Sequence, residues 1–348
     1  MRLGIIGTGL MASAINEASK DLTDIEVVAV LSRKLQTARN FCAHTAQTAM
    51  PFDDMSCFLN SIDAVYIATP PSQHAIAIEA ALKAGRAVLC EKPLTTTSED
   101  TERVVALARL SGVTLMEAIW TLVLPTYRAA ADSLLHLGLP RRLTFDFSYP
   151  LEVAESSHFL ERENGGVLLD RAVYGLSAGL SFLGTAIDHK AFITRDATGL
   201  DRSAELRLIH AGGDISIISI SFDLLGGNGL EIAGPNGLIR IGPPSLAAET
   251  MHWEPYSSSA PTNFGKGSKN TKYINRLKAQ PTVRRLRSTV KALRQRFHDY
   301  GASPYAPMLT EFRQVAESGN VESSLVPLQL SCEIAAIVQK ARQCGVRQ

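Results

Sequence analysis

The chain has 348 residues, of which 45% are hydrophobic and 20% are charged, and its formal net charge is +1. These values are typical of a globular protein, and the length exceeds that at which one hydrophobic core keeps growing, so we expect two domains. The charge excludes a general attraction to nucleic acid or membrane. Five scattered cysteines without a C-x-x-C pair, no secretory signal and no apolar run of membrane-spanning length predict a cytoplasmic protein without disulfides or a bound metal.

A short apolar strand is predicted over residues 3–6, and it leads directly into a glycine-rich turn. The turn has the pattern G-x-G-x-x-A and a helical pattern follows it, an arrangement in which glycines let the backbone approach a pyrophosphate at a helix N-terminus. The alternative is a plain tight turn between a strand and a helix. We assign as cofactor contacts Gly7, Thr8, Gly9, Leu10 and Met11.

The second predicted strand, residues 26–31, ends in Ser32 and Arg33 and carries no acid at its tip. An acid there would bind the ribose 2′-hydroxyl of NAD, whereas a hydroxyl followed by arginine suits the 2′-phosphate of NADP. The sequence therefore favours NADP(H), with NAD(H) as the second choice. The alternative is that Arg33 stacks on the adenine or is a solvated charge at a helix start.

Strand and helix patterns alternate as far as residue 120. Strands are predicted over 64–68 and 87–90, and helices over 75–84 and 98–110. Such alternation is typical of a parallel sheet covered by helices on both faces. We therefore expect a dinucleotide-binding Rossmann domain over residues 1–120.

The tripeptide Glu91-Lys92-Pro93 directly follows the strand predicted over 87–90. Ligands bind outside the carboxyl ends of parallel strands, so a lysine at this point is placed for chemistry. Pro93 ends the strand and restricts the backbone of Lys92. A solvated turn is the alternative, and we take Lys92 as the first catalytic candidate.

The pattern changes in the second half of the chain, where we expect a substrate-binding and oligomerisation domain over residues 121–348. Alternating apolar residues and Gly or Asn turns predict a mostly antiparallel sheet. The expected helices cover residues 125–137, 308–317 and 328–341, and the expected strands cover 143–148, 205–210, 215–222, 230–233 and 238–241.

A second chemical cluster follows Gly165-Gly166 in this domain. Asp170 and Tyr174 are four residues apart, so on a helix they share one face and can address one ligand. A phenol titrates near 10, and an adjacent ammonium group such as that of Lys92 is expected to lower its pKa. The alternatives are a core tyrosine and an acid at a helix start.

These motifs together resemble the Gfo/Idh/MocA oxidoreductases. The resemblance implies a Rossmann domain followed by an α/β domain with an open sheet that is often used for dimerisation. With the matching motifs we add to the candidate cofactor contacts Thr69, Pro70, His74, Glu91, Lys92 and Trp120. Most relatives carry His at the position of Tyr174, and the Tyr form resembles the branch of dihydrodiol dehydrogenases and NADP-dependent xylose dehydrogenases. The matching residues are Gly7-x-Gly9-x-x-Ala12, Ala68-Thr69-Pro70-Pro71 with His74, Glu91-Lys92-Pro93, and Gly165-Gly166 with Asp170 and Tyr174.

The chain departs from that branch at Leu122 and Val123, where an Arg and an aromatic residue are usual. Losing a planar cation near the substrate is expected to change which polar group is recognised. We therefore expect hydride transfer to or from a carbinol carbon of a sugar, cyclic polyol, diol or nucleotide sugar, and leave the substrate open. Tyr174 is expected to be the general acid/base, and Lys92 to hold the substrate oxygen and stabilise the phenolate. Asp170 is expected to orient either Lys92 or a second substrate hydroxyl. Lys92 as the base, with Tyr174 only a binding group, is the alternative.

The segment 265–296, within an insertion of about 257–298, contains eleven Lys and Arg residues and no acid. Apolar residues at helical spacing over 283–297 predict a basic amphipathic helix. A solvated helix on the second domain is the simplest interpretation. The alternatives are contact with nucleic acid or an anionic membrane, cover for a partner subunit, and binding of a charged substrate. A non-catalytic NADP-binding sensor or scaffold with a basic arm is therefore the alternative to an enzyme.

Overall fold

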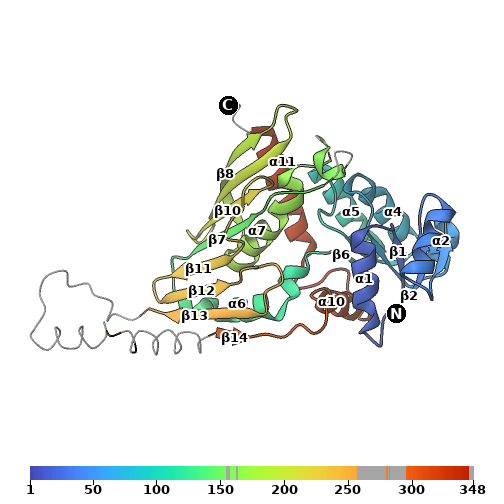
Figure 1. Ribbon diagram of the computed structural model, residues 1–348, viewed down its shortest axis with the longest axis horizontal. Coiled ribbons are helices and arrows are strands. Elements are labelled where there is room, and N and C mark those ends of the chain that lie inside the picture. The colour runs from blue at the N-terminus through green and yellow to red at the C-terminus, as the bar shows by residue number, and fades with distance from the viewer. Residues whose placement is uncertain (154–156, 162–163, 257–279, 281, 283–294, 345–348) are drawn as a thin grey trace, which may run out of the picture.

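The chain folds into two domains, each built on its own sheet, in the computed structural model of Figure 1. The structure describes residues 1–153, 157–161, 164–256, 280, 282 and 295–344. Within these ranges no helix combines the length and the apolar character needed to cross a membrane.

The first sheet has six parallel strands in the order β3-β2-β1-β4-β5-β6, which is the order of a dinucleotide-binding Rossmann fold. Its central strands are almost entirely apolar because helices cover both of their faces. The order reverses between β1 and β4, which is where such sheets bind ligands. The strands are β1 (Arg2–Ile6), β2 (Glu26–Leu31), β3 (Met50–Phe52), β4 (Ala64–Ile67), β5 (Ala87–Cys90) and β6 (Leu115–Glu117).

The two helices predicted over 75–84 and 98–110 begin and end within one residue of those positions, whereas residues 35–44 and 55–60 form helices that were not predicted. Thr97 caps α5 by accepting a hydrogen bond from the Asp100 amide at 3.2 Å, and Gly112 ends the helix with a φ of 65°. The helical elements are α1 (Leu10–Lys20), α2 (Leu35–His44), α3 (Met55–Asn60), the 3₁₀ turn η1 (Pro71–Gln73), α4 (His74–Lys83), α5 (Ser98–Ser111) and the 3₁₀ turn η2 (Trp120–Val123).

The second sheet has eight strands in the order β14-β13-β12-β11-β7-β10-β9-β8. Neighbouring strands are antiparallel except β7 and β10, which run parallel, so the expectation of a mostly antiparallel sheet is confirmed. Three of its strands, β8, β13 and β14, were not predicted. The strands are β7 (Arg142–Ser148), β8 (Ala186–Arg195), β9 (Asp201–His210), β10 (Ile215–Ser221), β11 (Leu230–Gly234), β12 (Gly237–Ile241), β13 (Thr250–Pro255) and β14 (Gln295–Phe297).

Helix α7 (Val167–Leu183) covers one face of this sheet by packing on β7, β9 and β10 (Figure 1). The approach is close at Gly175, where a Cβ atom would lie 2.5 Å from Ile218 Cγ2. Leu206 and Leu208 of β9 face the helix and are fully buried, whereas the intervening positions of β9 point to the other face. Near α7 the chain also forms η4 (His158–Leu160), and the domain opens with α6 (Pro125–Ser133) and the 3₁₀ turn η3 (Leu134–Leu137).

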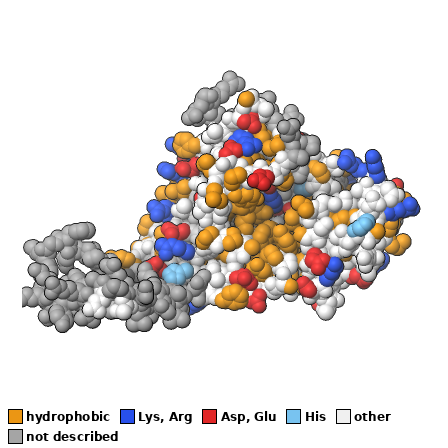
Figure 2. All heavy atoms as spheres, viewed as in Figure 1, with side chains coloured by type: hydrophobic (Ala, Val, Ile, Leu, Met, Phe, Trp, Pro, Cys, Tyr) orange, Lys and Arg blue, Asp and Glu red, His pale blue; other side chains and the backbone are white. Residues whose placement is uncertain are grey.

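The last helices return to the first domain. Helix α10 (Ala306–Glu317) packs on η2 and α1, and α11 (Leu328–Cys344) packs on α7 and α5. The Gln339 side chain of α11 accepts a hydrogen bond from the Ser98 amide at 2.7 Å and donates one to Glu99 at 2.8 Å. Helix α11 therefore connects the two domains, because it contacts α7 in the second domain and α5 in the Rossmann domain. On the face shown in Figure 2, hydrophobic side chains gather where the two domains meet, and charged side chains lie mainly around them.

The basic helix predicted over 283–297 lies mostly outside the described residues, as does most of the segment 265–296. Its end is described, and there the prediction is wrong because residues 295–297 form the edge strand β14. The backbone of these residues pairs with β13, and His252 stands opposite Gln295 in the register. Pairing with an open strand edge outweighs a helical spacing of apolar side chains at this point.

Candidate active site

The glycine-rich turn connects β1 to α1 and leaves open space where a diphosphate would approach. Gly7 has a φ of +113°, and a Cβ atom there would lie 2.5 Å from the Ala68 carbonyl oxygen, so only glycine fits. Nothing lies within 4 Å of a Cβ built on Gly9. Helix α1 starts at the exposed Leu10 and has no acid in its first turn, so its N-terminus favours an anion. Thr8 and Met11 flank the turn and are half-buried.

The end of β2 lies beside this turn, because the Gly7 amide donates to the Leu31 carbonyl oxygen at 3.0 Å. Ser32 is half-buried and Arg33 is exposed. A hydroxyl and a guanidinium are therefore available where the adenosine ribose of a dinucleotide lies in this fold. Their chemistry fits a 2′-phosphate better than a free 2′-hydroxyl.

His74 holds two loops together rather than facing a ligand. Its ring is fully buried, with Nδ1 3.0 Å from the Pro93 carbonyl oxygen and Nε2 2.9 Å from the Thr69 carbonyl oxygen. The interpretation of His74 as a direct cofactor contact is corrected by this burial. Thr69 and Pro70, in the same loop, are half-buried and exposed, respectively, and remain available to a ligand.

Lys92, Asp170 and Tyr174 converge although they come from different domains. Lys92 Nζ lies 2.5 Å from Asp170 Oδ1 and 2.7 Å from the Asp170 carbonyl oxygen. The same nitrogen is 5.3 Å from the centroid of the Tyr174 ring, which is one helical turn beyond Asp170 on α7. The Lys92 side chain is 14% exposed, so solvent screens this cluster only weakly.

The surroundings fix how protons are held in this cluster. Burial by itself would lower the pKa of Lys92, but Asp170, Tyr174 and the hydrogen bond to Asp170 together raise it above its ordinary value, so the amine stays an ammonium at neutral pH. Burial raises the pKa of Tyr174 to about 12, against the lowering effect of Lys92. The expected lowering by Lys92 is present, but the net pKa of the phenol is raised rather than lowered, because desolvation outweighs the ammonium charge.

Trp120 contacts the Tyr174 phenol, and Tyr305 in turn packs on Trp120. Trp120 is 7% exposed and its Nε1 donates to the Tyr174 hydroxyl at 3.4 Å, so its indole positions the phenol. The Trp120 ring also packs edge-on against Tyr305, with the ring centroids 5.0 Å apart. Tyr305 is a site residue that the sequence did not reveal, because it precedes α10 and reaches the site only through the return of the chain.

Glu91 is buried and accepts a hydrogen bond from the Tyr66 hydroxyl, and burial raises the pKa of this carboxyl. It therefore stabilises the turn that carries Lys92 rather than offering exposed atoms to a cofactor. Leu122 and Val123 are 6% and 4% exposed and lie in the core, so they present no polar group to a substrate. That the loss of a planar cation at this place changes which polar group is recognised stays a prediction.

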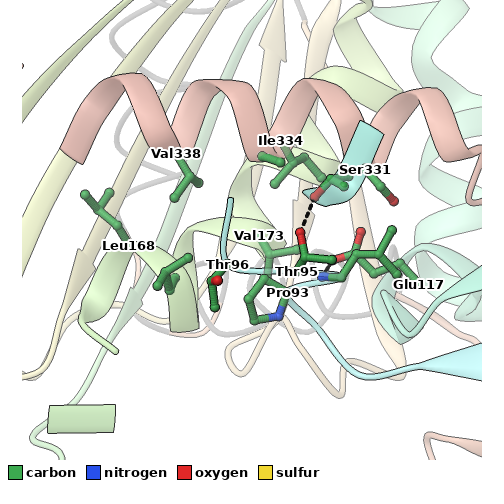
Figure 3. Close-up of a pocket in the computed structure, with 13 residues that line it drawn as sticks. Pro93, Thr95, Thr96, Glu117, Leu168, Val173, Ser331, Ile334 and Val338 are labelled. Carbon is green, nitrogen blue, oxygen red and sulfur yellow. Dashed lines mark hydrogen bonds between the residues drawn. The ribbon is translucent and has the colours of Figure 1, made fainter. Parts of the chain in front are cut away.

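A small cavity lies behind the Lys92-Pro93 turn, between α5, α7 and α11 (Figure 3). Its volume of about 20 Å³ leaves room for about one water molecule, so it is not the substrate site. Glu117 lines it and accepts a hydrogen bond from the Leu94 amide at 2.9 Å. Burial raises the pKa of Glu117 to about 7, against the lowering effects of the nearby Ser331 hydroxyl and the Leu94 amide.

Comparisons with known proteins identify the family. Residues 1–119 match the GFO_IDH_MocA family, described as an oxidoreductase family with an NAD-binding Rossmann fold. The scyllo-inositol 2-dehydrogenase (NADP(+)) of Bacillus subtilis is 31% identical over 255 residues, which cover 69% of this chain and 76% of that protein. The chain therefore belongs to the Gfo/Idh/MocA family, as its motifs predicted. It is an NAD(P)-dependent dehydrogenase or reductase acting on CH–OH groups.

Other relatives agree with this assignment. The dTDP-3,4-didehydro-2,6-dideoxy-alpha-D-glucose 3-reductase of Saccharopolyspora spinosa is 32% identical, covering 69% of this chain and 74% of that protein. The trans-1,2-dihydrobenzene-1,2-diol dehydrogenase of Sus scrofa is 29% identical with the same coverage. The crystal structure of a 3-ketoreductase from Actinomadura kijaniata with NADP and TDP-benzene shares the fold, with a TM-score of 0.78, 24% identity and coverage of 99% of this chain and 98% of that one. The predicted NADP(H) cofactor agrees with these relatives.

The titration of Glu117 predicts how stability depends on pH. The pKa of Glu117 is about 7 in the folded state and 4.5 ordinarily. Between pH 4.5 and 7 the folded state therefore keeps a proton that the unfolded state has released. The free energy of unfolding falls as pH rises through this window. The Glu117→Gln variant keeps an acceptor for the Leu94 amide and does not ionise. We expect its unfolding free energy to exceed that of the wild type by on the order of 3 kcal/mol at pH 8, and the difference to vanish near pH 4.5.

Urea unfolding of both proteins at several pH values measures this difference. The matched control is Glu26→Gln, which changes an exposed glutamate of β2 and should leave the pH dependence of the wild type intact. Parallel curves for wild type and Glu117→Gln would contradict the prediction.

Proposed function

We propose that this enzyme transfers a hydride between NADP(H) and a carbinol or carbonyl carbon of a polyhydroxylated ring, namely an inositol, a sugar or a nucleotide-linked sugar. The observation that carries the proposal is the Lys92, Asp170 and Tyr174 cluster at the carboxyl end of β5. The names of the relatives support the substrate class, since they act on an inositol, a dTDP-linked deoxyhexose and a cyclic diol.

The side chains of this chain manage the proton and the orientation of the substrate. NADP(H), when bound, supplies the hydride chemistry. Tyr174 acts as general acid in reduction and as general base in oxidation, and Lys92 holds the substrate oxygen with its ammonium group. Asp170 fixes Lys92 in place through two contacts, one from its carboxylate and one from its backbone carbonyl.

Two directions of proton transfer place different demands on Tyr174. With a pKa of about 12 the phenol is protonated at neutral pH, so it is ready to donate a proton to a carbonyl oxygen. As a base it must first lose that proton, and the adjacent Lys92 ammonium favours the loss. The Lys92 amine is already protonated at neutral pH because its pKa is raised, so it serves as a charge beside the substrate oxygen, which supports Tyr174 in the acid/base role.

A turnover screen tests the proposed function. Purified protein is assayed with NADP(H) against scyllo-inositol, aldoses, cyclic diols and dTDP- and UDP-linked sugars in both directions, by the absorbance of the reduced nicotinamide. We expect turnover with at least one polyhydroxylated ring. Tight NADPH binding without turnover on any of these substrates would contradict the proposal.

With the substrate found, Tyr174→Phe should lower kcat by about 10²–10⁴ and leave the Kd for NADPH unchanged, because the ring keeps its packing and loses only the transferable proton. Tyr256→Phe is the control, since it removes the same hydroxyl from a ring that follows β13 and is 61% exposed. Unimpaired turnover of Tyr174→Phe would refute its role.

We propose NADP(H) as the preferred cofactor because Ser32 and Arg33 follow β2 without an acid. Arg33→Ala should raise the Kd for NADPH about tenfold and leave the Kd for NADH unchanged, since a charge-assisted hydrogen bond to a 2′-phosphate is lost. Fluorescence titration measures both constants. Arg39→Ala, in the exposed part of α2, is the control, and an equal loss for both cofactors would overturn the assignment.

We also propose that the chain forms a dimer through the open face of the second sheet, with the domain over residues 121–348 serving both substrate binding and oligomerisation. The face opposite α7 exposes Phe192, Ile209 and Ile215 by 58%, 41% and 37%. In the sheet register, Glu205 pairs with Phe192 and Ile209 pairs with Ile215, so the three apolar side chains lie on one surface. Removing such apolar area from water favours association.

Phe192→Lys should shift the protein toward monomers, because it places a charge in the proposed interface. Sedimentation equilibrium at micromolar concentration measures the change. Leu135→Lys is the control, since Leu135 is 90% exposed in η3, outside the sheet. A wild-type protein that sediments as a monomer would rule out this interface.

A further inference from the structure

Arg171 is a buried cation beside the site for which the proposed mechanism has no use. It follows Asp170 directly, and these two are the charged residues of α7. The side chain is 0% exposed, and burying a charge is costly unless it is paired. Its Nε lies 3.7 Å from Asp170 Oδ2, and among the described residues neither Nε nor Nη2 has a hydrogen-bond partner.

Aromatic rings surround this cation. The guanidinium carbon lies 3.8 Å from the ring centroid of Tyr149, 4.6 Å from that of Phe222 and 5.1 Å from that of Phe147. The negative faces of such rings stabilise a cation in a desolvated position. Arginine stays charged under these conditions even though burial lowers its pKa.

The same guanidinium fastens the ends of two strands. Its Nη1 donates to the Tyr149 carbonyl oxygen at 2.9 Å and to the Ser221 carbonyl oxygen. These atoms lie where the parallel strands β7 and β10 leave the sheet, since Ser148 and Ser221 are the last partners in the register. Arg171 therefore fixes the backbone of two strand ends relative to the first turn of α7.

The Asp170 carboxylate lies between two cations. Oδ1 contacts Lys92 Nζ at 2.5 Å and Oδ2 faces Arg171 Nε at 3.7 Å. A second positive charge beside the Asp170 carboxylate weakens the stabilisation that this carboxylate gives to the Lys92 ammonium. It also favours the deprotonated form of nearby groups. Arg171, which lies outside the reacting cluster, thus acts on the charge of Lys92 through Asp170.

We propose that Arg171 is a positioning residue that acts on Lys92 as the second cation on Asp170, while it holds the ends of β7 and β10 in place beside the site. The inference rests on the proposed function only in treating Lys92 and Tyr174 as the reacting groups. The titratable and charged groups that face this arrangement are Tyr149, Asp170 and Asp223 around Arg171, and Glu91, Asp170 and Tyr174 around Lys92.

Chemical labelling of Lys92 tests the inference without a substrate. Only the free amine is acylated, so the labelling rate reports how tightly Lys92 holds its proton. The full-length ligand-free protein is treated at pH 9 with the acetylating reagent sulfo-N-hydroxysuccinimide acetate, and the rate at Lys92 is divided by that at the exposed Lys20, using peptide mass spectrometry. Arg171→Met and Arg171→Gln should lower this ratio about tenfold, which corresponds to a rise of about one unit in the pKa of Lys92.

Control variants separate charge from packing. Arg171→Lys keeps a cation and should leave the ratio within about twofold of the wild type. Arg202→Met removes a different guanidinium, which lies 5.8 Å from the Phe222 ring and pairs with Asp223, and it should leave the ratio unchanged. A purely structural role for Arg171 would loosen the site and expose Lys92, so the ratio would rise instead of falling.

The outcomes decide the inference independently of the turnover screen. An unchanged or raised ratio in the neutral variants overturns it, as does a tenfold fall in Arg171→Lys. Failure of both Arg171→Met and Arg171→Gln to fold would assign Arg171 to the stability of the fold alone and would also overturn it. An absence of turnover on every substrate would leave the labelling result intact and count against the proposed function only.

Discussion

The ion pair between Lys92 and Asp170 is the contact on which the site depends. It joins the carboxyl end of β5 in the Rossmann domain to the first turn of α7 in the second domain, with Nζ and Oδ1 2.5 Å apart. The two side chains are 14% and 15% exposed, so each charge has lost most of its hydration and would be destabilising without the other. The pair therefore fixes the distance between the domains at the site that we propose for the nicotinamide and the substrate.

The close packing of helix α7 holds Asp170 and Tyr174 in fixed positions. Every residue of the helix except Asp170 and Ser181 is buried, because the sheet covers one side and α11 the other. A close-packed helix holds its side chains in few rotamers. Tyr174 is thereby held one turn from Asp170, and Trp120 closes its far side.

Local patterns in the sequence were sufficient to predict the parts of the site that lie at element ends. The glycine turn, Lys92 after β5 and the spacing of Asp170 and Tyr174 follow from strand and helix periodicity. Tyr305 and the charge balance of Tyr174 did not follow, because they depend on which residues return from distant positions and on how much water they exclude. The edge strand β14 could not be predicted either, because the spacing of apolar residues does not report an open sheet edge.

Desolvation gives the site a definite resting state. Burial keeps the proton on the Tyr174 phenol, whereas the Asp170 carboxylate keeps the proton on the Lys92 amine. Both groups stay protonated although Lys92 Nζ lies only 5.3 Å from the centroid of the Tyr174 ring. A substrate oxygen that enters between them meets two donors, so a carbonyl oxygen is stabilised as it gains negative charge. An alcohol oxygen instead needs the phenol to lose its proton first, which a further positive charge near the ring assists. In the proposed mechanism the same residues thus serve both directions of the reaction, and the charges around Asp170 set the balance between them.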